Sequence, residues 1–504
     1  MSKAVTATPK EVRTLFEAPP LFETAPSFAV SLNPMLQKIM ERGRIALAQD
    51  ENFLENNSHP SGRYGIGVVD LEKLHGPYLY TSKGYYFDYT YHWMTDLLDR
   101  KKHQELDENN LLLFLGALSF EKPTPTEITT EIQASFVKMM QEFFSRGDKE
   151  KESNFTVLPV SAGVLGVADA IDNAKGLVAE KYLKEGKTIE ENQLKGIAFG
   201  GAFHGRYDDP ADGTSNKEKT GHKWNNKITR VEEAPIIIYN QDGSVDENGT
   251  EELFEQSMAQ VERSMAQDEH AYVIIEYPFQ AEGGARLVNP NALRRLNEIC
   301  QKNGKLLIVD NVQMSGRSWT INPDGSASPF TEEVLKYAHI TTFGKVFHAN
   351  GSVYDLEKIK ELGLNPEFIR EKGPQRLGGT HTSSMHDMLS GMMVMQTIQD
   401  KKLWENLFER SYKLYAGLQT LSEVHPDILQ KVRMREDTGY LAWSFPSNGE
   451  REKFWNFMKD NEHIIFLRAG KDSIRIAPAP DMTQKELDGI LTAVSRQLKR
   501  MDNK

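Results

Sequence analysis

Cysteine is almost absent from this chain, which has one, Cys300, among 504 residues. A single thiol cannot form a disulfide within the chain, and it cannot build a cysteine-based zinc site by itself. A disulfide-stabilised secreted scaffold is therefore excluded, and a reducing compartment is the natural location. We expect a cytoplasmic protein with no metal site.

Long apolar runs and an excess of positive charge are also missing. The apolar stretches at 236–239 and 272–275 fall far short of the ~20 residues that a membrane helix needs. The first ten residues lack the apolar segment of a secretory signal. The formal net charge is −12, whereas nucleic acids and anionic membranes bind basic surfaces. We therefore expect neither a membrane nor a nucleic acid as a partner.

The composition that remains is typical of a globular protein, with 39% hydrophobic and 26% charged residues. At ~150 residues per domain, the length allows about three domains or one large two-lobed enzyme. Proline-rich residues 1–60 predict an extended arm with a helix at 35–48, and short aromatic runs between 63 and 91 predict antiparallel strands. Apolar spacing predicts a helix over 127–146, which Gly147 would end.

The middle of the chain alternates strand-like and helical patterns. This order predicts right-handed crossovers in a mainly parallel sheet flanked by helices, which is an α/β fold. We expect Asn289 to cap the second of the helices, Pro290 to be its first residue and Gly304 to end it. The patterns place helices at 251–265 and 290–302, and strands at 196–200, 271–278, 306–312 and 339–344.

The last third predicts shorter strands between helices, and the polar segment 207–226 predicts a long surface loop. Thr483 and Glu486 form a capping-box pattern at the start of the last helix. The expected elements are helices at 386–400, 403–424 and 483–499, and strands at 440–445, 464–467 and 473–476.

Two polar residues lie directly at the carboxyl ends of apolar strands, where open α/β sheets bind their ligands. Lys345 follows the 339–344 run. A lysine in such a place is usually a surface charge, but it can also be a nucleophile that forms an imine with a carbonyl cofactor. Asp310 ends an apolar run and would need a cation or strong donors if buried, such as a protonated pyridine nitrogen. The alternative for Asp310 is an ordinary helix cap or turn.

Two further clusters follow strands and are weaker signals by themselves. Residues 200–206 (GGAFHGR) combine glycines, which let a backbone approach a ligand, with rings that can stack on it. Residues 276–284 (EYPFQAEGG) place a carboxylate at a strand end, followed by two glycines, and are equally compatible with an ordinary turn.

The segments 200–206 and 276–284 and the strand ends at Asp310 and Lys345 follow one another in this order along the chain. Taken together, they resemble the corresponding segments of the class III (omega) pyridoxal-phosphate-dependent aminotransferases, which have fold type I. Within the class the sequence is most similar to lysine 6-aminotransferase and then to 4-aminobutyrate aminotransferase. Residues 161–171 (SAGVLGVADAI) resemble the family's phosphate turn and the helix after it. The resemblance runs over about 65–495 and is strongest over 195–345.

The resemblance implies a division into three segments. Residues 1–110 would form an N-terminal arm and part of a small α+β domain, and residues 111–385 would form the large cofactor-binding domain. Residues 386–504 would complete the small domain, which is therefore built from both ends of the chain.

The resemblance also implies pyridoxal 5'-phosphate as the cofactor and assigns residues to its ring. Lys345 matches the Schiff-base lysine, and Asp310 matches the aspartate that pairs with the pyridine nitrogen. These two would be the catalytic residues. Gln313 matches the glutamine near the phenolic oxygen, and Phe203 matches the aromatic side chain that stacks on the ring.

Three residues match the family's phosphate-binding positions. Ala162 and Gly163 match backbone donors at a helix N-terminus, where free N–H groups favour an anion. Thr380 matches a threonine that reaches the phosphate from the partner subunit, which implies a homodimer with shared active sites.

Three charged residues match positions that hold the substrate. Arg475 matches the arginine that binds an α-carboxylate, and Arg206 matches the arginine at the other end of the substrate. Glu282 matches an acidic gate that pairs with Arg475 in one half-reaction. These positions imply a terminal-amine donor, such as lysine, ornithine or 4-aminobutyrate, and 2-oxoglutarate as the acceptor.

The sequence departs from the family at several positions. Asn311 and Ala168 each stand where the family usually has Glu. Residues 89–93 (YTYHW) are aromatic where the family has small residues. Residues 381–384 (HTSS) lack the family's Gly-Gly-Asn, and the phosphate turn has Ala-Gly where Gly-Gly or Ser-Gly is usual. Two alternatives stay open: another pyridoxal-phosphate reaction on the same fold, such as an aminomutase, epimerase or decarboxylase, and a degenerate member without catalysis.

Overall fold

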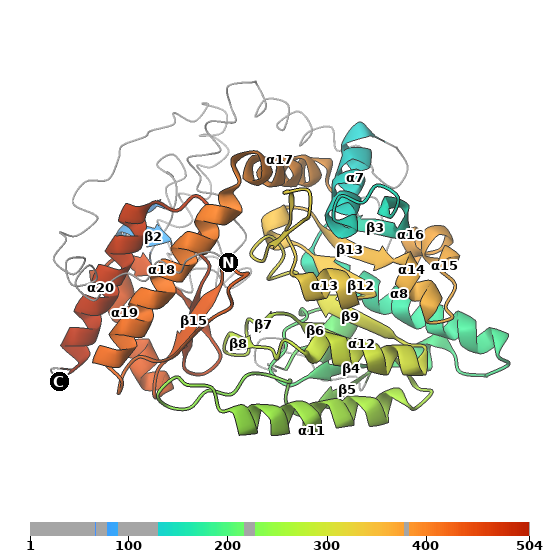
Figure 1. Ribbon diagram of the computed structural model, residues 1–504, viewed down its shortest axis with the longest axis horizontal. Coiled ribbons are helices and arrows are strands. Elements are labelled where there is room, and N and C mark those ends of the chain that lie inside the picture. Colours follow the sequence, from blue (N-terminus) through green and yellow to red (C-terminus); the bar gives the residue numbers. More distant parts are fainter. Residues whose placement is uncertain (1–65, 67–77, 89–129, 216–226, 377–382, 503–504) are drawn as a thin grey trace, which may run out of the picture.

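The computed structural model describes residues 66, 78–88, 130–215, 227–376 and 383–502 (Figure 1). Its centre is a seven-stranded sheet in which β5, β4, β6, β9 and β12 run parallel, while β13 is antiparallel to both β12 and β3. The expected mainly parallel sheet is therefore confirmed. In spatial order the strands are β3 (Phe155–Val160), β13 (Asn350–Asp355), β12 (Ile340–Phe343), β9 (Leu306–Asp310), β6 (His270–Glu276), β4 (Lys195–Phe199) and β5 (Ile228–Val231).

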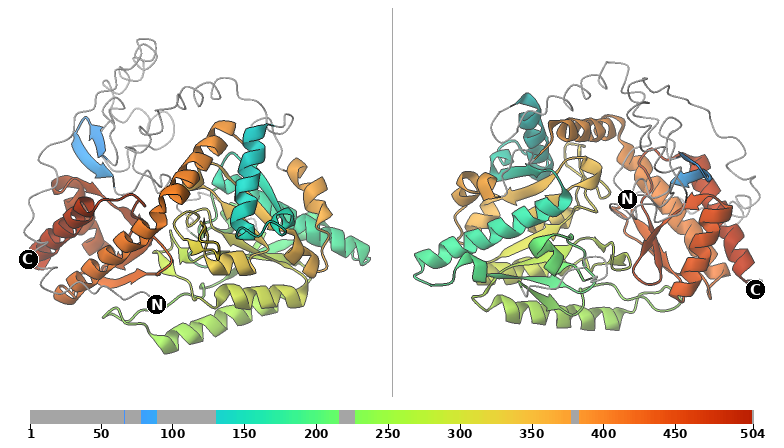
Figure 2. Two further views of the ribbon diagram at one scale, coloured as in Figure 1. Left: turned by 45° about the horizontal axis from the view of Figure 1, so that its top comes forward. Right: turned by 180° about the vertical axis from the view of Figure 1, so that it is seen from behind.

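Helices cover both faces of this sheet, which explains why its strands are apolar almost throughout. Along β6, Tyr272 and Ile274 pack in the same cluster as α8 (Gly163–Lys184). Val273 and Ile275 point the other way. The layers lie on either side of the sheet in Figures 1 and 2. The helices of the second face are α7 (Glu131–Ser145), α11 (Glu247–Met265), α12 (Ala292–Asn303) and α17 (Met385–Lys401).

The C-terminal elements form a second layered unit with its own apolar core around Trp443. The antiparallel sheet has the order β14 (Gln430–Met434), β15 (Leu441–Ser444), β18 (Ser473–Ile476) and β17 (Leu467–Ala469). Its helices are α18 (Leu403–Val424), α19 (Asn448–Asn461) and α20 (Gln484–Asp502).

A third small sheet joins segments from the two ends of the described chain. The hairpin β1 (Tyr78–Thr81) and β2 (Gly84–Asp88) is antiparallel, and β16 (Ile464–Ile465) pairs with β2 in parallel. The blue hairpin lies beside the red C-terminal elements in Figure 2. The domain limits at 110 and 385 stay a prediction, since much of 1–129 lies outside the described residues.

Most expected elements are present, and two expectations need correction. Helix α12 begins at Ala292, so Asn289 and Pro290 precede it, and the Asn289 Oδ1 accepts the Asn291 N–H at 2.9 Å instead of capping the helix. The helix ends at Gly304 as expected, with φ +60°. The expected loop at 207–226 contains the helix α9 (Asp208–Gly213), and its 216–226 part lies outside the described residues, as does the helix expected at 35–48.

The remaining elements are short. None of the described helices is both long enough and apolar enough to span a bilayer. The short elements are η3 (Glu152–Asn154), η4 (Glu191–Gln193), β7 (Phe279–Gln280) paired with β8 (Arg286–Leu287), β10 (Thr320–Ile321) paired with β11 (Ala327–Ser328), α13 (Glu332–Tyr337), η5 (Lys345–Phe347), α14 (Leu356–Glu361), α15 (Glu367–Glu371) and α16 (Gly373–Arg376).

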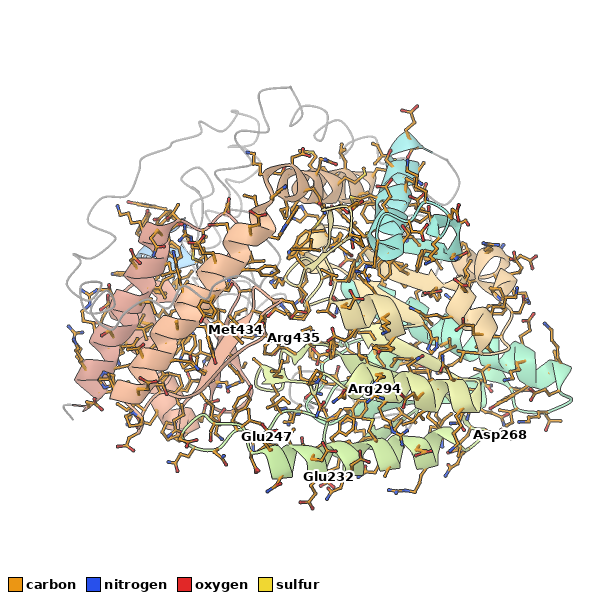
Figure 3. The ribbon with its side chains drawn as sticks, viewed as in Figure 1. Glu232, Glu247, Asp268, Arg294, Met434 and Arg435 are labelled. Atoms are coloured by element: carbon orange, nitrogen blue, oxygen red, sulfur yellow. The ribbon has the colours of Figure 1, made fainter. Side chains whose placement is uncertain are left out.

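Arg435 connects the C-terminal unit with the central layers and is labelled in Figure 3. Its Nη2 lies 2.7 Å from both carboxylate oxygens of Glu333 on α13, and its Nε lies 2.7 Å from Asp437. The side chain also donates to the Tyr277 hydroxyl. Charged hydrogen bonds of this kind fix orientation as well as adding stability, so the two units are held in register where they meet.

Close backbone packing holds α17 against η5, the turn that carries Lys345. A Cβ added at Gly391 of α17 would lie 1.9 Å from the Phe347 carbonyl oxygen. This distance is far below van der Waals contact, and the opposing atom is backbone, so the two elements would have to separate to admit any side chain.

We expect Gly391→Ala to lower the free energy of unfolding by about 1–3 kcal/mol, as overpacked sites do. Chemical denaturation monitored by circular dichroism measures this. The matched control is Gly449→Ala in the first turn of α19, where the nearest atom to the added Cβ is the Ser447 Oγ at 3.6 Å. An equal effect of the two substitutions would contradict the packing argument.

Candidate active site

A cavity of about 720 Å³ lies at the carboxyl ends of β12, β9, β6 and β4. Eight of the ten residues expected to form the site line it. Arg475 is joined to the cavity through its contact with Glu282, and Thr380 lies outside the described residues. The lining residues that the sequence predicted are Ala162, Gly163, Phe203, Arg206, Glu282, Asp310, Gln313 and Lys345.

A row of three polar side chains forms the floor of the site, and the register of the sheet creates it. Thr342 pairs with Asp310 across β12 and β9, and Asp310 pairs with Glu276 across β9 and β6. Since neighbouring residues at one level of a sheet point to the same face, these three side chains lie side by side on the α8 face. Asp310 and Glu276 are the last residues of their strands, and Thr342 is the last but one of β12, so all three lie at one edge of the parallel sheet.

Asp310 is buried, with 5% of its surface exposed, and is surrounded by donors. Its Oδ1 accepts the Thr342 hydroxyl at 3.0 Å and the Val312 backbone N–H at 3.2 Å. Its Oδ2 lies 2.8 Å from the His204 Nδ1. These contacts fix the carboxylate in one orientation, which a group that must meet a specific atom of a ligand requires.

Lys345 follows β12 and lies in a strained backbone conformation, with φ +52°. Its Nζ donates to the Gln313 Oε1. The pKa of Lys345 is lowered to about 7, mainly by burial and also by the nearby charges of Arg475 and Arg317. A large part of the amine is therefore unprotonated at neutral pH, the state in which it can attack a carbonyl.

The N-terminus of α8 faces the same cavity. Ala162 is the N-cap, has an extended backbone and makes no side-chain cap, so the first N–H groups of a 22-residue helix are not satisfied by a capping side chain. A Cβ at Gly163 would lie 2.8 Å from the Val312 Cγ1, and glycine thus keeps this space clear. Such a terminus favours an anion through its N–H groups and its dipole.

The loop after β4 brings Phe203 to the cavity. Glu276 accepts the Phe203 backbone N–H at 3.0 Å, and the Thr214 hydroxyl accepts the next N–H, of His204, at 2.9 Å. The Arg206 guanidinium lies 5.9 Å from the centre of the Phe203 ring, and Arg206 is exposed to solvent. Phe203 is therefore held from its backbone, with a ring and a cation at the cavity wall.

Arg475 on β18 is buried, and its guanidinium donates to Glu282 and, at 3.4 Å, to the Tyr440 hydroxyl. Burial alone lowers the pKa of Arg475, but the carboxylate of Glu282 and the Tyr440 hydroxyl outweigh it and raise the pKa above the usual value. The pair places an arginine able to bind a carboxylate directly behind an acidic side chain.

The backbone around Glu282 is held from the C-terminal unit. The buried Arg433 donates to the Ala285 carbonyl at 2.8 Å and to the Gly284 carbonyl. The Gly470 N–H donates to the Glu282 carbonyl at 3.0 Å. With its main chain tied in this way, Glu282 can release Arg475 by turning its side chain.

Comparison with known proteins identifies the family. A model of the class-III aminotransferases matches residues 128–498. The L-lysine-epsilon aminotransferase of Amycolatopsis lactamdurans is 24% identical over 439 residues, which are 86% of this chain and 92% of that protein. The 4-aminobutyrate aminotransferase of Schizosaccharomyces pombe is 27% identical over 287 residues, 56% of each chain. A solved structure of the lysine aminotransferase from Mycobacterium tuberculosis, in the internal aldimine form, superposes with a TM-score of 0.75 at 22% identity and covers 90% of this chain and 99% of its own. The chain belongs to the class-III aminotransferases and is a transaminase.

Class-III aminotransferases depend on pyridoxal phosphate, and the residues present here fit that group. A cavity of this size holds a small cofactor together with a substrate. The uncapped N-terminus of α8 suits the phosphate, and the buried Asp310 carboxylate suits a protonated ring nitrogen. The Lys345 amine has the lowered pKa that attachment to an aldehyde requires.

Three contributors to the site had no assigned role in the sequence, namely Thr342, His204 and Glu276. All three lie inside the strand-end segments 339–344, 200–206 and 276–284, so the alternation of apolar residues indicated their places. Which side chains would meet depended on the register between the strands, which the sequence pattern alone does not show. Asn311, a departure from the family, makes no part of the lining and donates to the Tyr277 carbonyl at 2.8 Å. The aromatic segment 89–93 and His381 lie outside the described residues.

The low pKa of Lys345 predicts unusual reactivity in the protein without cofactor. We expect an amine-directed reagent to modify Lys345 with a rate that levels off above about pH 7. An ordinary lysine reacts faster up to ~pH 10. Peptide mass spectrometry after short labelling pulses at several pH values measures this, with exposed Lys302 as the internal control. A Lys345 rate that continues to rise with that of Lys302 would contradict the prediction.

Proposed function

We propose that this enzyme moves a terminal amino group from a donor such as lysine, ornithine or 4-aminobutyrate to 2-oxoglutarate, with pyridoxal 5'-phosphate as cofactor. The observation that carries the proposal is the contact between Glu282 and Arg475 beside a cavity that Arg206 also lines. An acidic side chain that pairs with a carboxylate-binding arginine can either block that arginine or leave it open to a substrate carboxylate.

When bound, pyridoxal phosphate supplies an aldehyde that links to an amine and a ring that accepts electrons. Lys345 would hold the cofactor through its amine and, once that amine is free, would act as the general base that takes up and returns the substrate proton. Asp310, fixed by Thr342 and His204, would keep the ring nitrogen protonated. Gln313, now on the Lys345 amine, would lie near the phenolic oxygen, and Phe203 would cover the ring.

The two arginines would bind different substrates in the two half-reactions. With Glu282 on Arg475, the α-carboxylate site is masked, and a terminal amine can enter with its carboxylate end on Arg206. With Glu282 turned away, glutamate or 2-oxoglutarate can engage both arginines. Because an arginine–carboxylate pair sheltered from water is strong, this switch can change preference by about a kcal/mol or more.

The similar proteins support this substrate class without identifying the substrate. The relatives from Amycolatopsis lactamdurans and Schizosaccharomyces pombe are named for lysine and for 4-aminobutyrate, two terminal-amine donors, and both are distant in sequence. We also propose a cytoplasmic homodimer in which Thr380 binds the partner's phosphate. The dimer rests on the resemblance alone, and light scattering of the purified protein tests it.

The proposal is tested by supplying the amino donor alone. We expect lysine, ornithine or 4-aminobutyrate to convert the bound cofactor from its aldehyde to its amine form in one turnover, and 2-oxoglutarate to restore it. Absorbance spectroscopy and mass analysis of the released cofactor measure both steps. Lys345→Ala should show neither conversion while keeping its far-ultraviolet circular dichroism. A product formed with the cofactor left in its aldehyde form would instead indicate an epimerase or decarboxylase.

The gate predicts opposite effects on the two half-reactions. In Glu282→Ala, Arg475 is always open, so we expect the ratio of the glutamate rate to the terminal-amine rate to rise about tenfold, equivalent to ~1.4 kcal/mol. Stopped-flow single turnovers measure both rates. The matched control is Glu233→Ala, which removes a carboxylate 2.7 Å from Arg286 on β8, four residues after Glu282, and lies outside the cavity lining. Equal changes in both rates for Glu282→Ala would overturn the gate.

A further inference from the structure

Glu276 is a buried carboxyl in the cavity for which the proposed function has no use. It ends β6 beside Asp310, is 4% exposed, and lines the cavity. It forms no ion pair with any residue that the structure describes. Two carboxyl groups at one level of a sheet, without a cation between them, repel each other if both are ionised.

A backbone hydrogen bond from the loop after β4 reaches Glu276. The Glu276 Oε2 accepts the Phe203 N–H at 3.0 Å, which holds the segment that presents Phe203 and Arg206. Glu276 ends β6, and the chain continues from it through β7 to Glu282. Glu276 thus fixes the Phe203 segment to the end of the strand that leads to the gate.

The surroundings of Glu276 favour its protonated form. The pKa of Glu276 is raised to about 8, mainly by burial and also by the Asp310 charge, while the Phe203 N–H opposes the shift. Glu282 adds a smaller repulsion from its own loop. The other titratable groups that face this part of the cavity are His204 on the β4 loop, Lys345 after β12 and Tyr440 before β15.

We propose that Glu276 is a positioning residue that carries a proton at neutral pH, and that this neutral carboxyl holds the Phe203 loop at the end of β6 while leaving Asp310 as the lone carboxylate of the floor. The proposal rests on the proposed function only for the identity of the cofactor. The proton stays on Glu276 throughout, and no bond is made or broken there.

The consequence is a cofactor affinity that depends on the Glu276 proton. Above about pH 8, Glu276 ionises and places a second negative charge beside Asp310. Pyridoxal phosphate is an anion in this range, so the added charge disfavours its binding. Glutamine keeps an acceptor oxygen and cannot ionise, and it therefore reproduces the protonated form at every pH.

The test is a titration of the cofactor-free enzyme and its Glu276→Gln variant with pyridoxal phosphate, followed by protein fluorescence. We expect the two dissociation constants to agree near pH 6.5 and the wild-type value to become about tenfold larger by ~pH 9, as expected for one ionisation near 8. Glu276→Ala should bind more weakly than both at every pH, because it has no acceptor for the Phe203 N–H. A ratio of wild type to Gln that is constant over this range would overturn the proposal, and so would an Ala variant that binds like Gln.

A second measurement does not need the cofactor. A carboxyl whose pKa is higher in the folded than in the unfolded protein contributes stability at low pH that is lost as the pH rises through this window. The melting temperature of Glu276→Gln minus that of wild type should therefore increase between about pH 5 and about pH 8. A constant difference would overturn the proposal. If these results hold but no donor yields the amine form of the cofactor, the proposed function fails and the role of Glu276 stands.

Discussion

The register of the parallel ladder is the constraint on which the site depends. The strands β12, β9 and β6 are hydrogen-bonded in a register that pairs Thr342 with Asp310 and Asp310 with Glu276. The three side chains therefore lie at one level of the sheet and on one face. A shift by one residue in any strand would turn its polar end into the apolar layer on the other face. The geometry of the floor is thus specified by the apolar alternation of the strands, several residues away from the chemistry.

The site holds several charged groups close together and largely buried, which is costly unless each charge has a partner. Each charged group of this site is stabilised in a different way. Asp310 is surrounded by donors, Arg475 is paired with Glu282, and Lys345 has a low pKa. Each of these groups is therefore prepared for a ligand before one arrives, and the protein needs little rearrangement to accept the cofactor.

Much of the fold and the site could be predicted from the sequence. Apolar periodicity located the strand that ends at Asp310 and the strand that precedes Lys345, and the order of the motifs located Phe203 and Glu282. The strands β3, β5, β13 and β14 were missed, since their runs are short and those of β3 and β13 contain Pro159 and Gly351, which weaken the pattern. Partners such as Thr342, His204 and Arg433 could not be predicted, because their contacts join segments far apart in the chain.

The pairing of Glu282 with Arg475 also has a meaning for the order in which the protein is made. During synthesis, Asp310 and Lys345 leave the ribosome first, Arg433 follows, and Arg475 on β18 comes last. Since domains tend to fold from the N-terminal side during synthesis, the central layers can assemble their floor while the gate still lacks its cation. The pair of Glu282 and Arg475 is then the last part of the described site that the growing chain completes.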